Sequence, residues 1–222
     1  GGWPLPPMVR LEEAVAAVDG SCGWVLTLCA GAGWFAGFLP PAIARVLLAT
    51  PGLCLAGSGQ VGGVAEREGA GWRLHGDWGF ATGAPLATHF TLNARLQAGG
   101  QPIVDEAGAP RVRAFVVDAA PVRRHADWRS VGMRSSGTHS FSLAGAWVPE
   151  GQAFDIRPEA ATDPGTLYRF PFTELAWVTL AANLSGMALA FLHAAEQRAR
   201  ADRKSTRLNS SHSQQSRMPS SA

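Results

Sequence analysis

Hydrophobic and polar positions divide the 222-residue chain into three zones. Up to about residue 50, apolar residues recur at three- and four-residue steps or fill whole segments, and this pattern predicts helices over residues 11–18, 22–38 and 42–49. Asp19-Gly20-Ser21 separates the first two helices, with Ser21 as the expected cap of the second, and Pro40-Pro41 ends that second helix. We therefore expect a small helical domain at the start of the chain.

From residue 53 the pattern changes to short strands separated by turn residues. Alternation is clearest where Trp72 and Leu74 interleave with Arg73 and His75, the period of a half-buried strand. Gly76-Asp77 follows as the expected turn of a hairpin. We predict strands over residues 53–56, 72–75, 90–96, 111–117 and 140–148.

The last zone contains one long helix over residues 172–203, with an apolar stripe that begins at Leu175, and a linker at 151–165 precedes it. Residues 204–222 are rich in serine and lack apolar periodicity, which is typical of a disordered segment. This stretch also resembles translated sequencing-adapter read-through, so we interpret it as a disordered, non-native tail. Since residue 1 is Gly rather than Met, we expect a fragment of a longer protein.

Composition excludes several classes of function. A net charge of +2 argues against a nucleic-acid platform, and 46% hydrophobic residues suffice for a substantial core. The three cysteines have no C-x-x-C spacing and the six histidines are scattered, so we expect no metal site. With no signal peptide, the chain is expected to be reduced and cytoplasmic.

Two segments have the features of a membrane span and of a dinucleotide-binding loop, respectively. Residues 20–44 carry no charge, which raises the possibility of a membrane span, but four glycines and the proline pair favour a buried helix and no membrane association. Gly57-Ser-Gly59-Gln-Val-Gly62 has the spacing of a dinucleotide-binding loop after a strand, yet too few residues follow for the required helix. We therefore reject a Rossmann site.

Two stretches carry candidate chemistry. Trp78 and Phe80 form an aromatic face just before Thr82, which fits either a wall for a flat ligand or ordinary β-core packing. The segment from Gly132 to Thr138 is rich in small hydroxyl side chains and backbone donors. It fits either a phosphate or flavin edge or a polar turn before a strand, and the residues alone leave both choices open.

Four motifs in order, DGSCGW at 19–24, GDWGFATG at 76–83, GMRSSGT at 132–138 and WVPE at 147–150, resemble the acyl-CoA dehydrogenase superfamily. The closest similarity is to its flavin-dependent monooxygenase branch with a type 2 C-terminal domain. The T-E-P and G-S-D sequences usual in the dehydrogenases are missing from residues 56–63. Leu86 stands where the monooxygenases often have a histidine, although His89 is near.

The resemblance implies an α+β fold in the superfamily's order. Residues 1–50 would end an N-terminal helical domain, residues 51–155 would form a central antiparallel β-barrel or sandwich, and residues 166–203 would start a C-terminal helical bundle. The tail at 204–222 lies outside this scheme. The full-length parent would be a homotetramer.

The resemblance also implies a two-component monooxygenase, in which a separate flavin reductase supplies reduced FMN or FAD and the oxygenase uses O₂ to hydroxylate a small aromatic substrate. Thr82 would lie near flavin N5 and act in catalysis, next to Gly83. Trp78 and Phe80 would wall the ring, and Ser136 and Thr138 would contact the flavin or its phosphate. The alternatives are a flavin-dependent acyl-CoA dehydrogenase and a truncated, non-catalytic domain.

Overall fold

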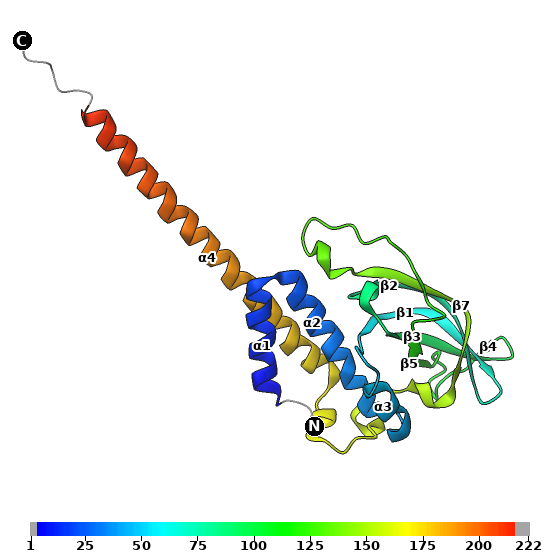
Figure 1. Cartoon of the computed structure of the whole chain (residues 1–222). Helices are drawn as coiled ribbons and strands as arrows, with labels where there is room; N and C mark the ends of the chain where they lie inside the picture. The colour runs from blue at the N-terminus through cyan, green and yellow to red at the C-terminus, as the bar shows by residue number, and fades with distance from the viewer. Residues whose placement is uncertain (1–3, 216–222) are drawn as a thin grey trace, which may run out of the picture.

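The computed structural model describes residues 4–215, with side chains for residues 4–203. A helical layer and a β-domain lie side by side, and the last helix extends far beyond both (Figure 1). The expected α+β organisation is confirmed. Residues 216–222 of the expected disordered tail lie outside the described residues.

The helical layer consists of α1 (Leu5–Val18), α2 (Gly20–Ala32) and the first part of α4 (Phe172–Gln215), which pack on one another (Figure 1). A 3-10 helix (Gly33–Phe38) and α3 (Pro41–Leu48) lead from this layer to the sheet. The cap of α2 is Asp19, whose side chain accepts a hydrogen bond from the Cys22 amide at 2.8 Å. The expected cap Ser21 instead lies inside the helix.

Two glycines let the helices approach closely. A Cβ atom added at Gly23 of α2 would lie 2.6 Å from the backbone of Ala16 in α1. One added at Gly186 of α4 would lie 2.1 Å from the carbonyl oxygen of Glu13 in α1. The helix–helix contacts therefore depend on the absence of side chains at these points.

The sheet runs in the order β6-β7-β2-β1-β3-β5-β8, with β4 paired to β3. Its pairs are antiparallel except for β1 with β3, which is parallel. The path is open, because no pairing among residues 4–215 joins β6 to β8, and a closed barrel is not shown. The strands are β1 (Leu55–Glu68), β2 (Gly71–Ala81), β3 (His89–Ala98), β4 (Gln101–Pro102), β5 (Val112–Asp118), β6 (Arg123–Arg124), β7 (His139–Pro149) and β8 (Ala153–Phe154).

The hairpin turn predicted at Gly76-Asp77 is wrong. β2 runs straight through it, and the turn lies at residues 69–70, between β1 and β2. Gly76 instead pairs with Gly63, where an added Cβ would lie 2.4 Å from the Trp78 ring. The glycine-rich stretch that resembles a dinucleotide loop is thus part of strand β1, in which Gly62 and Gly63 leave room for the indole.

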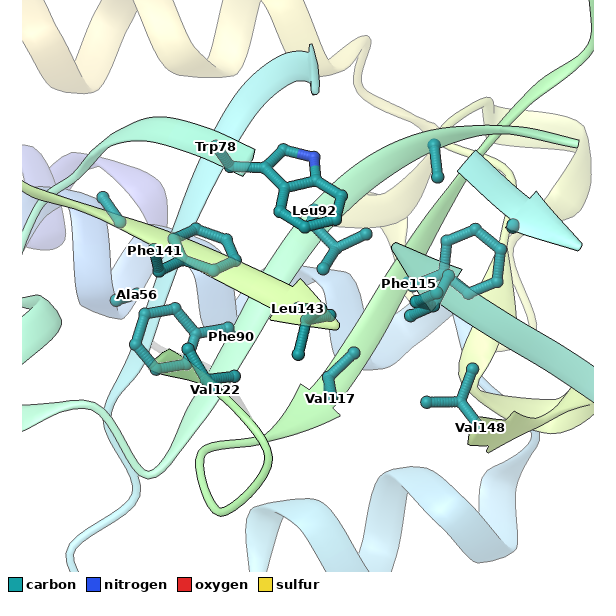
Figure 2. Close-up of a cluster of buried hydrophobic side chains, with 14 of the residues drawn as sticks. Ala56, Trp78, Phe90, Leu92, Phe115, Val117, Val122, Phe141, Leu143 and Val148 are labelled. Atoms are coloured by element: carbon teal, nitrogen blue, oxygen red, sulfur yellow. The ribbon is translucent and has the colours of Figure 1, made fainter. Parts of the chain in front are cut away.

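Large aromatic side chains fill the inner face of the sheet (Figure 2). Trp78, Phe90, Phe115 and Phe141 have no exposed surface. Trp78 stacks on Phe141 with ring centroids 5.3 Å apart, and its indole nitrogen donates to the carbonyl of Asn93 at 2.9 Å. This buried cluster fixes β2, and with it the residues that follow Trp78.

Helix α4 buries only one side. Leu175 and Ala182 are buried, whereas Trp177, Leu184 and Phe191 are 65%, 57% and 73% exposed. Residues seven apart share a helix face, so the last three form an apolar stripe, here called the α4 stripe. The expected core-facing stripe is thereby split. By length and composition alone, Gly20–Phe38 and Phe172–Arg203 could each cross a membrane, which is weak support for a span.

Candidate functional site

Phe80 stands out at the end of β2, because it combines a strained backbone with an exposed ring. Its φ of 62° lies in the left-handed region, which is unfavourable for a bulky side chain, and 65% of its surface is exposed. The pairing of β2 with β7 is irregular here, between Trp78 and Ala81. Strain of this kind persists where the surrounding structure imposes it, and it concentrates at functional sites.

Two residues further on, Thr82 presents its hydroxyl group to two partners. The indole nitrogen of Trp24, from α2, donates to Thr82 Oγ1 at 3.2 Å. Thr138 Oγ1 lies 3.0 Å from the same oxygen. Thr82 is 4% exposed and Trp24 is half-buried, so this contact joins the helical layer to the β-domain at the site.

The hydroxyl-rich loop of residues 132–138 packs directly against this point. Met133 and Gly137 adopt left-handed φ values of 57° and 55°, which fold the loop back on itself. The Gly83 amide donates to the carbonyl of Ser136 at 3.0 Å, and Ser136 Oγ lies 2.7 Å from Thr138 Oγ1. Of the residues that the sequence predicts, Thr82, Gly83, Ser136 and Thr138 thus come together. Phe80 lies near the end of β2, two residues before Thr82 in the chain.

Trp78 does not reach this group. It belongs to the buried aromatic cluster of the sheet and has no exposed surface that could flank a ligand (Figure 2). The irregular pairing after Trp78 separates its orientation from that of Phe80, so an aromatic face shared by the two is absent. Core packing, which the residues also allowed, is the arrangement of Trp78.

Two residues that the sequence reasoning assigned no role also line the site. Trp24 lies within the DGSCGW motif, which was the available signal, and Cys29 lies five positions later on α2. The Cys29 thiol donates to the carbonyl of Thr82 at 3.6 Å. Burial, together with the neighbouring Cys54, raises the pKa of Cys29 to about 12, so the group is a neutral donor rather than a nucleophile.

The polar groups that meet at Thr82 are uncharged at neutral pH: three hydroxyls, one indole N–H and one thiol. Such groups orient a neutral ligand through hydrogen bonds but are poor acids and bases. Together with the exposed Phe80 ring, they suit a planar heteroaromatic molecule with hydrogen-bonding atoms along its edge. The chemistry of these groups therefore suits hydrogen bonding to a ligand better than acid–base catalysis.

Charged groups gather at the opposite end of β2. Glu150, in the WVPE motif, accepts hydrogen bonds from Arg113 at 2.6 Å and Trp72 at 2.7 Å, and it also pairs with Arg67. Burial opposes ionisation of this carboxyl group, but the hydrogen bonds from Arg113, Trp72 and Arg67 lower its pKa overall. This network ties together the ends of β1, β2, β5 and β7 and is structural.

No profile of a known protein family matches the chain. Curated proteins do: it is 26% identical over 200 residues to a pigment production hydroxylase of Rhodococcus sp., with 85% of this chain and 50% of that protein covered. It is 23% identical to indole-3-acetate monooxygenase of Pseudomonas putida, and the match covers 86% of this chain and 47% of that protein. It is 28% identical to the oxygenase component of an FADH₂-dependent resorcinol hydroxylase of Rhizobium sp., and the match covers 67% of this chain and 35% of that protein.

Solved structures share the fold. XiaF from Streptomyces sp., in complex with FADH₂ and glycerol, has a TM-score of 0.72 and 28% identity, with 84% of this chain and 47% of XiaF covered. The HsaA monooxygenase of M. tuberculosis has a TM-score of 0.72 at 19% identity, with 82% and 48% covered, a likeness of fold alone. The chain spans about half the length of the curated relatives that it matches. Its homologues are oxygenase components of flavin-dependent monooxygenases with an acyl-CoA dehydrogenase-like fold, as the motifs indicated.

Proposed function

We propose that this chain forms the flavin-binding part of a monooxygenase component, which uses reduced flavin and O₂ to hydroxylate a small aromatic substrate. The observation that carries the proposal is the strained, exposed Phe80, two residues before the buried Thr82 in the chain. A soluble protein gains nothing in stability from holding a phenylalanine in this conformation in solvent. A flat ligand stacked on the ring would account for it.

The residues present fit a flavin, either FMN or FAD. Phe80 would cover the isoalloxazine ring and exclude water from it, and Thr82 would hold the ring edge at N5 as the catalytic hydroxyl. When bound, the reduced flavin would supply the electrons that activate O₂. The protein's share is to bind the ring, orient it and keep water away.

Gly83, Ser136 and Thr138, which were also expected at the flavin, would position Thr82 and the loop of residues 132–138. The Gly83 amide already donates to Ser136, so Gly83 positions the loop rather than the ligand. Ser136 is 1% exposed and Thr138 is 7% exposed, and both bond within the cluster. We therefore assign them to holding Thr82 and withdraw direct contact of Ser136 with a ligand.

The proposed partners follow from the same assignment. A separate flavin reductase would deliver the reduced cofactor, as expected for an oxygenase component. The α4 stripe of Trp177, Leu184 and Phe191 would be covered by helices of other copies in a homotetramer, since large exposed apolar patches mark interaction sites. A soluble, cytoplasmic protein is consistent with these partners.

Turnover tests the proposal directly. The chain is incubated with a flavin reductase, NADH, FMN or FAD, and a panel of phenols and indoles, with and without O₂. We expect hydroxylated product only when reductase, flavin and O₂ are all present, and loss of product in Phe80→Ala but not in Phe170→Ala, an exposed phenylalanine outside the site. Oxidation of a CoA ester with an artificial electron acceptor, without hydroxylation, would contradict it and favour a dehydrogenase.

A further inference from the structure

Two cysteine side chains meet where the helical layer adjoins the β-domain. Cys29 lies on α2, and Cys54 lies directly before β1. A Cβ atom added at Gly83 would lie 2.7 Å from the sulfur of Cys29 and 4.0 Å from the sulfur of Cys54. Because both sulfurs approach the same point, they lie within a few ångströms of each other. We call these two residues the cysteine pair.

Each member of the cysteine pair is held by a different part of the fold. The Cys29 thiol donates to the carbonyl of Thr82 at 3.6 Å. The Cys54 amide donates to Thr88 Oγ1 at 3.0 Å, and the Thr88 hydroxyl donates to the carbonyl of Cys54 at 3.1 Å. Both thiols are free and half-buried, so a small molecule reaches them from solvent. The proposed function gives neither sulfur a chemical task.

Two neighbouring thiols either bind a metal ion or form a disulfide. A protein metal site of this kind takes three or four ligands, and the described residues contain no group of three or more histidine, cysteine, aspartate or glutamate side chains placed to hold an ion. A disulfide needs only the two sulfurs and an oxidant. In reducing compartments such disulfides are usually transient and respond to the redox state.

We propose that hydrogen peroxide oxidises the cysteine pair to a disulfide, which ties α2 to the β-domain next to Thr82. In the first step one sulfur attacks the peroxide and breaks its O–O bond, which gives a sulfenic acid and one water molecule. In the second step the other sulfur displaces the hydroxyl group of the sulfenic acid, which gives the disulfide and a second water molecule. Two electrons pass from the sulfurs to the peroxide oxygens, and both thiol protons leave in water.

The proposed function would supply this oxidant. Reduced flavin and O₂ give hydrogen peroxide whenever no substrate takes up the oxygen. The source of the peroxide therefore rests on the proposed function. The disulfide itself does not, because peroxide from any source oxidises thiols.

The environment of Cys29 makes this reaction slow at neutral pH. Burial, together with the charge and hydrogen bonding of Cys54, raises the pKa of Cys29 to about 12. The thiolate is the reactive form, and it is the minor form of Cys29 at neutral pH. The cysteine pair therefore stays reduced while peroxide is scarce. Once a sulfenic acid has formed, the closeness of the two sulfurs favours the second step.

Oxidation changes the junction between the helical layer and the β-domain in two ways. The disulfide removes the S–H donor of Cys29, so the carbonyl of Thr82 loses this hydrogen bond. It also closes the loop between residues 29 and 54, which restricts the unfolded chain. The melting temperature of the oxidised protein should therefore rise by roughly 5–10 °C.

The experiment detects the disulfide in the whole chain without flavin. The exposed Cys22 is first replaced in Cys22→Ser, which leaves the cysteine pair as the only thiols of the sequence. The protein is treated with hydrogen peroxide, the remaining thiols are alkylated, and trypsin cleaves after Arg45, between Cys29 and Cys54. Mass spectrometry identifies linked peptides, and thermal unfolding is followed before and after addition of dithiothreitol.

We expect two peptides joined through Cys29 and Cys54, an intact mass about 2 Da below that of the reduced protein, and the rise in melting temperature, all reversed by dithiothreitol. Cys22→Ser combined with Cys54→Ser is the matched control and should show none of the three. Alkylation of both thiols after peroxide treatment, or oxidation of the two sulfurs to sulfinic acids without a linked peptide, would overturn the proposal. Neither result bears on the proposed function, because no flavin takes part.

Discussion

At the scale of single residues, Phe80 shows how the backbone and the site are linked. Its backbone is left-handed and its ring is exposed two residues before Thr82 in the chain, and glycine, which has no Cβ atom, would relieve the strain. A strained and exposed residue does not stabilise the fold, and the proposed function gives Phe80 a role in ligand binding instead.

Replacing Phe80 separates strain from function. Phe80→Gly and Phe80→Ala both delete the ring, so both should lose flavin affinity to a similar extent. Because only glycine adopts a positive φ freely, Phe80→Gly should exceed Phe80→Ala in free energy of unfolding by about 1 kcal/mol. Urea unfolding and flavin titration measure the two effects, and a glycine variant less stable than the alanine variant would refute the strain.

Glu12 is a second residue whose environment is unusual. It is 1% exposed in the helical layer, and its Oε2 atom has no hydrogen-bond partner among the described residues. Burial raises the pKa of Glu12 from its ordinary value of 4.5 to about 7. The neutral form is therefore favoured in the folded protein.

The consequence is a stability that depends on pH. The stabilisation from neutral Glu12 is fully present below pH 4.5 and is lost as the pH rises to about 7, because the unfolded chain releases this proton first. In Glu12→Gln the free energy of unfolding should decrease less between pH 5 and pH 8, and the variant should be more stable than the wild type at pH 8. Urea unfolding at pH 5, 6, 7 and 8 measures it, and parallel curves for the two proteins would rule it out.

At this scale, three side chains of the candidate site could be named from the sequence. Thr82, Ser136 and Thr138 were predicted from their motifs, and they do meet. The contact of Trp24 with Thr82 spans 58 residues, so no local pattern could reveal it. Trp78 and Phe80 were predicted to share one face of the strand, because side chains of a regular strand alternate between its two faces. The pairing of β2 with β7 is irregular after Trp78, so this alternation does not continue to Phe80.

At the scale of secondary-structure elements, close packing of α1, α2 and α4 depends on glycines. These residues weaken helices in isolation, yet Gly23 and Gly186 occur where another backbone lies within reach of a Cβ atom. Gly31, also on α2, has open space around its Cβ position. Gly23 and Gly31 therefore differ in what surrounds their Cβ positions.

This difference predicts opposite effects of one substitution. Gly23→Ala should lower the free energy of unfolding by about 1–3 kcal/mol, because the methyl group would overlap Ala16 and Asn183. Gly31→Ala should raise it by up to ~1 kcal/mol through helix propensity. Thermal and urea unfolding of both variants measure this, and equal effects would show that the helices do not pack as described.

Element positions were predicted better than element ends. Strands β3, β5 and β7 lie close to their predicted ranges, because each shows alternation or turn residues at its ends. β1 was predicted to end at residue 56, since glycines interrupt its pattern, but it runs to Glu68. Two of those glycines, Gly62 and Gly63, leave room for Trp78, a tertiary cause that a local pattern does not display.

At the scale of the whole molecule, the exposed α4 stripe is an apolar face without a partner among the described residues. Helices α1 and α2 cover one side of α4, and Trp177, Leu184 and Phe191 remain open on another. The helix was predicted to end near residue 203, but its backbone continues to Gln215. The periodicity of the sequence predicted an apolar face on α4, but it does not indicate which residues of that face pack against other helices of this chain.

The α4 stripe predicts self-association. The wild type should sediment as an oligomer, and Trp177→Glu combined with Phe191→Glu should shift it toward the monomer, because two charges cannot be buried unpaired at an interface. Val46→Glu, at an exposed apolar position on α3, should not. Sedimentation velocity measures this, and a wild type that remains monomeric at high concentration would argue against a homotetramer built on this face.

The central claim is that Thr82 and its neighbours bind flavin. The most direct measurement is an anaerobic titration of the chain with reduced FMN and FAD, in the wild type, Thr82→Val and Ser142→Ala. We predict one flavin bound per chain, affinity lowered about fivefold or more in Thr82→Val through loss of a buried hydrogen bond, and no change in Ser142→Ala. A wild type that binds no flavin, or a Thr82→Val variant that binds it equally well, would contradict the claim.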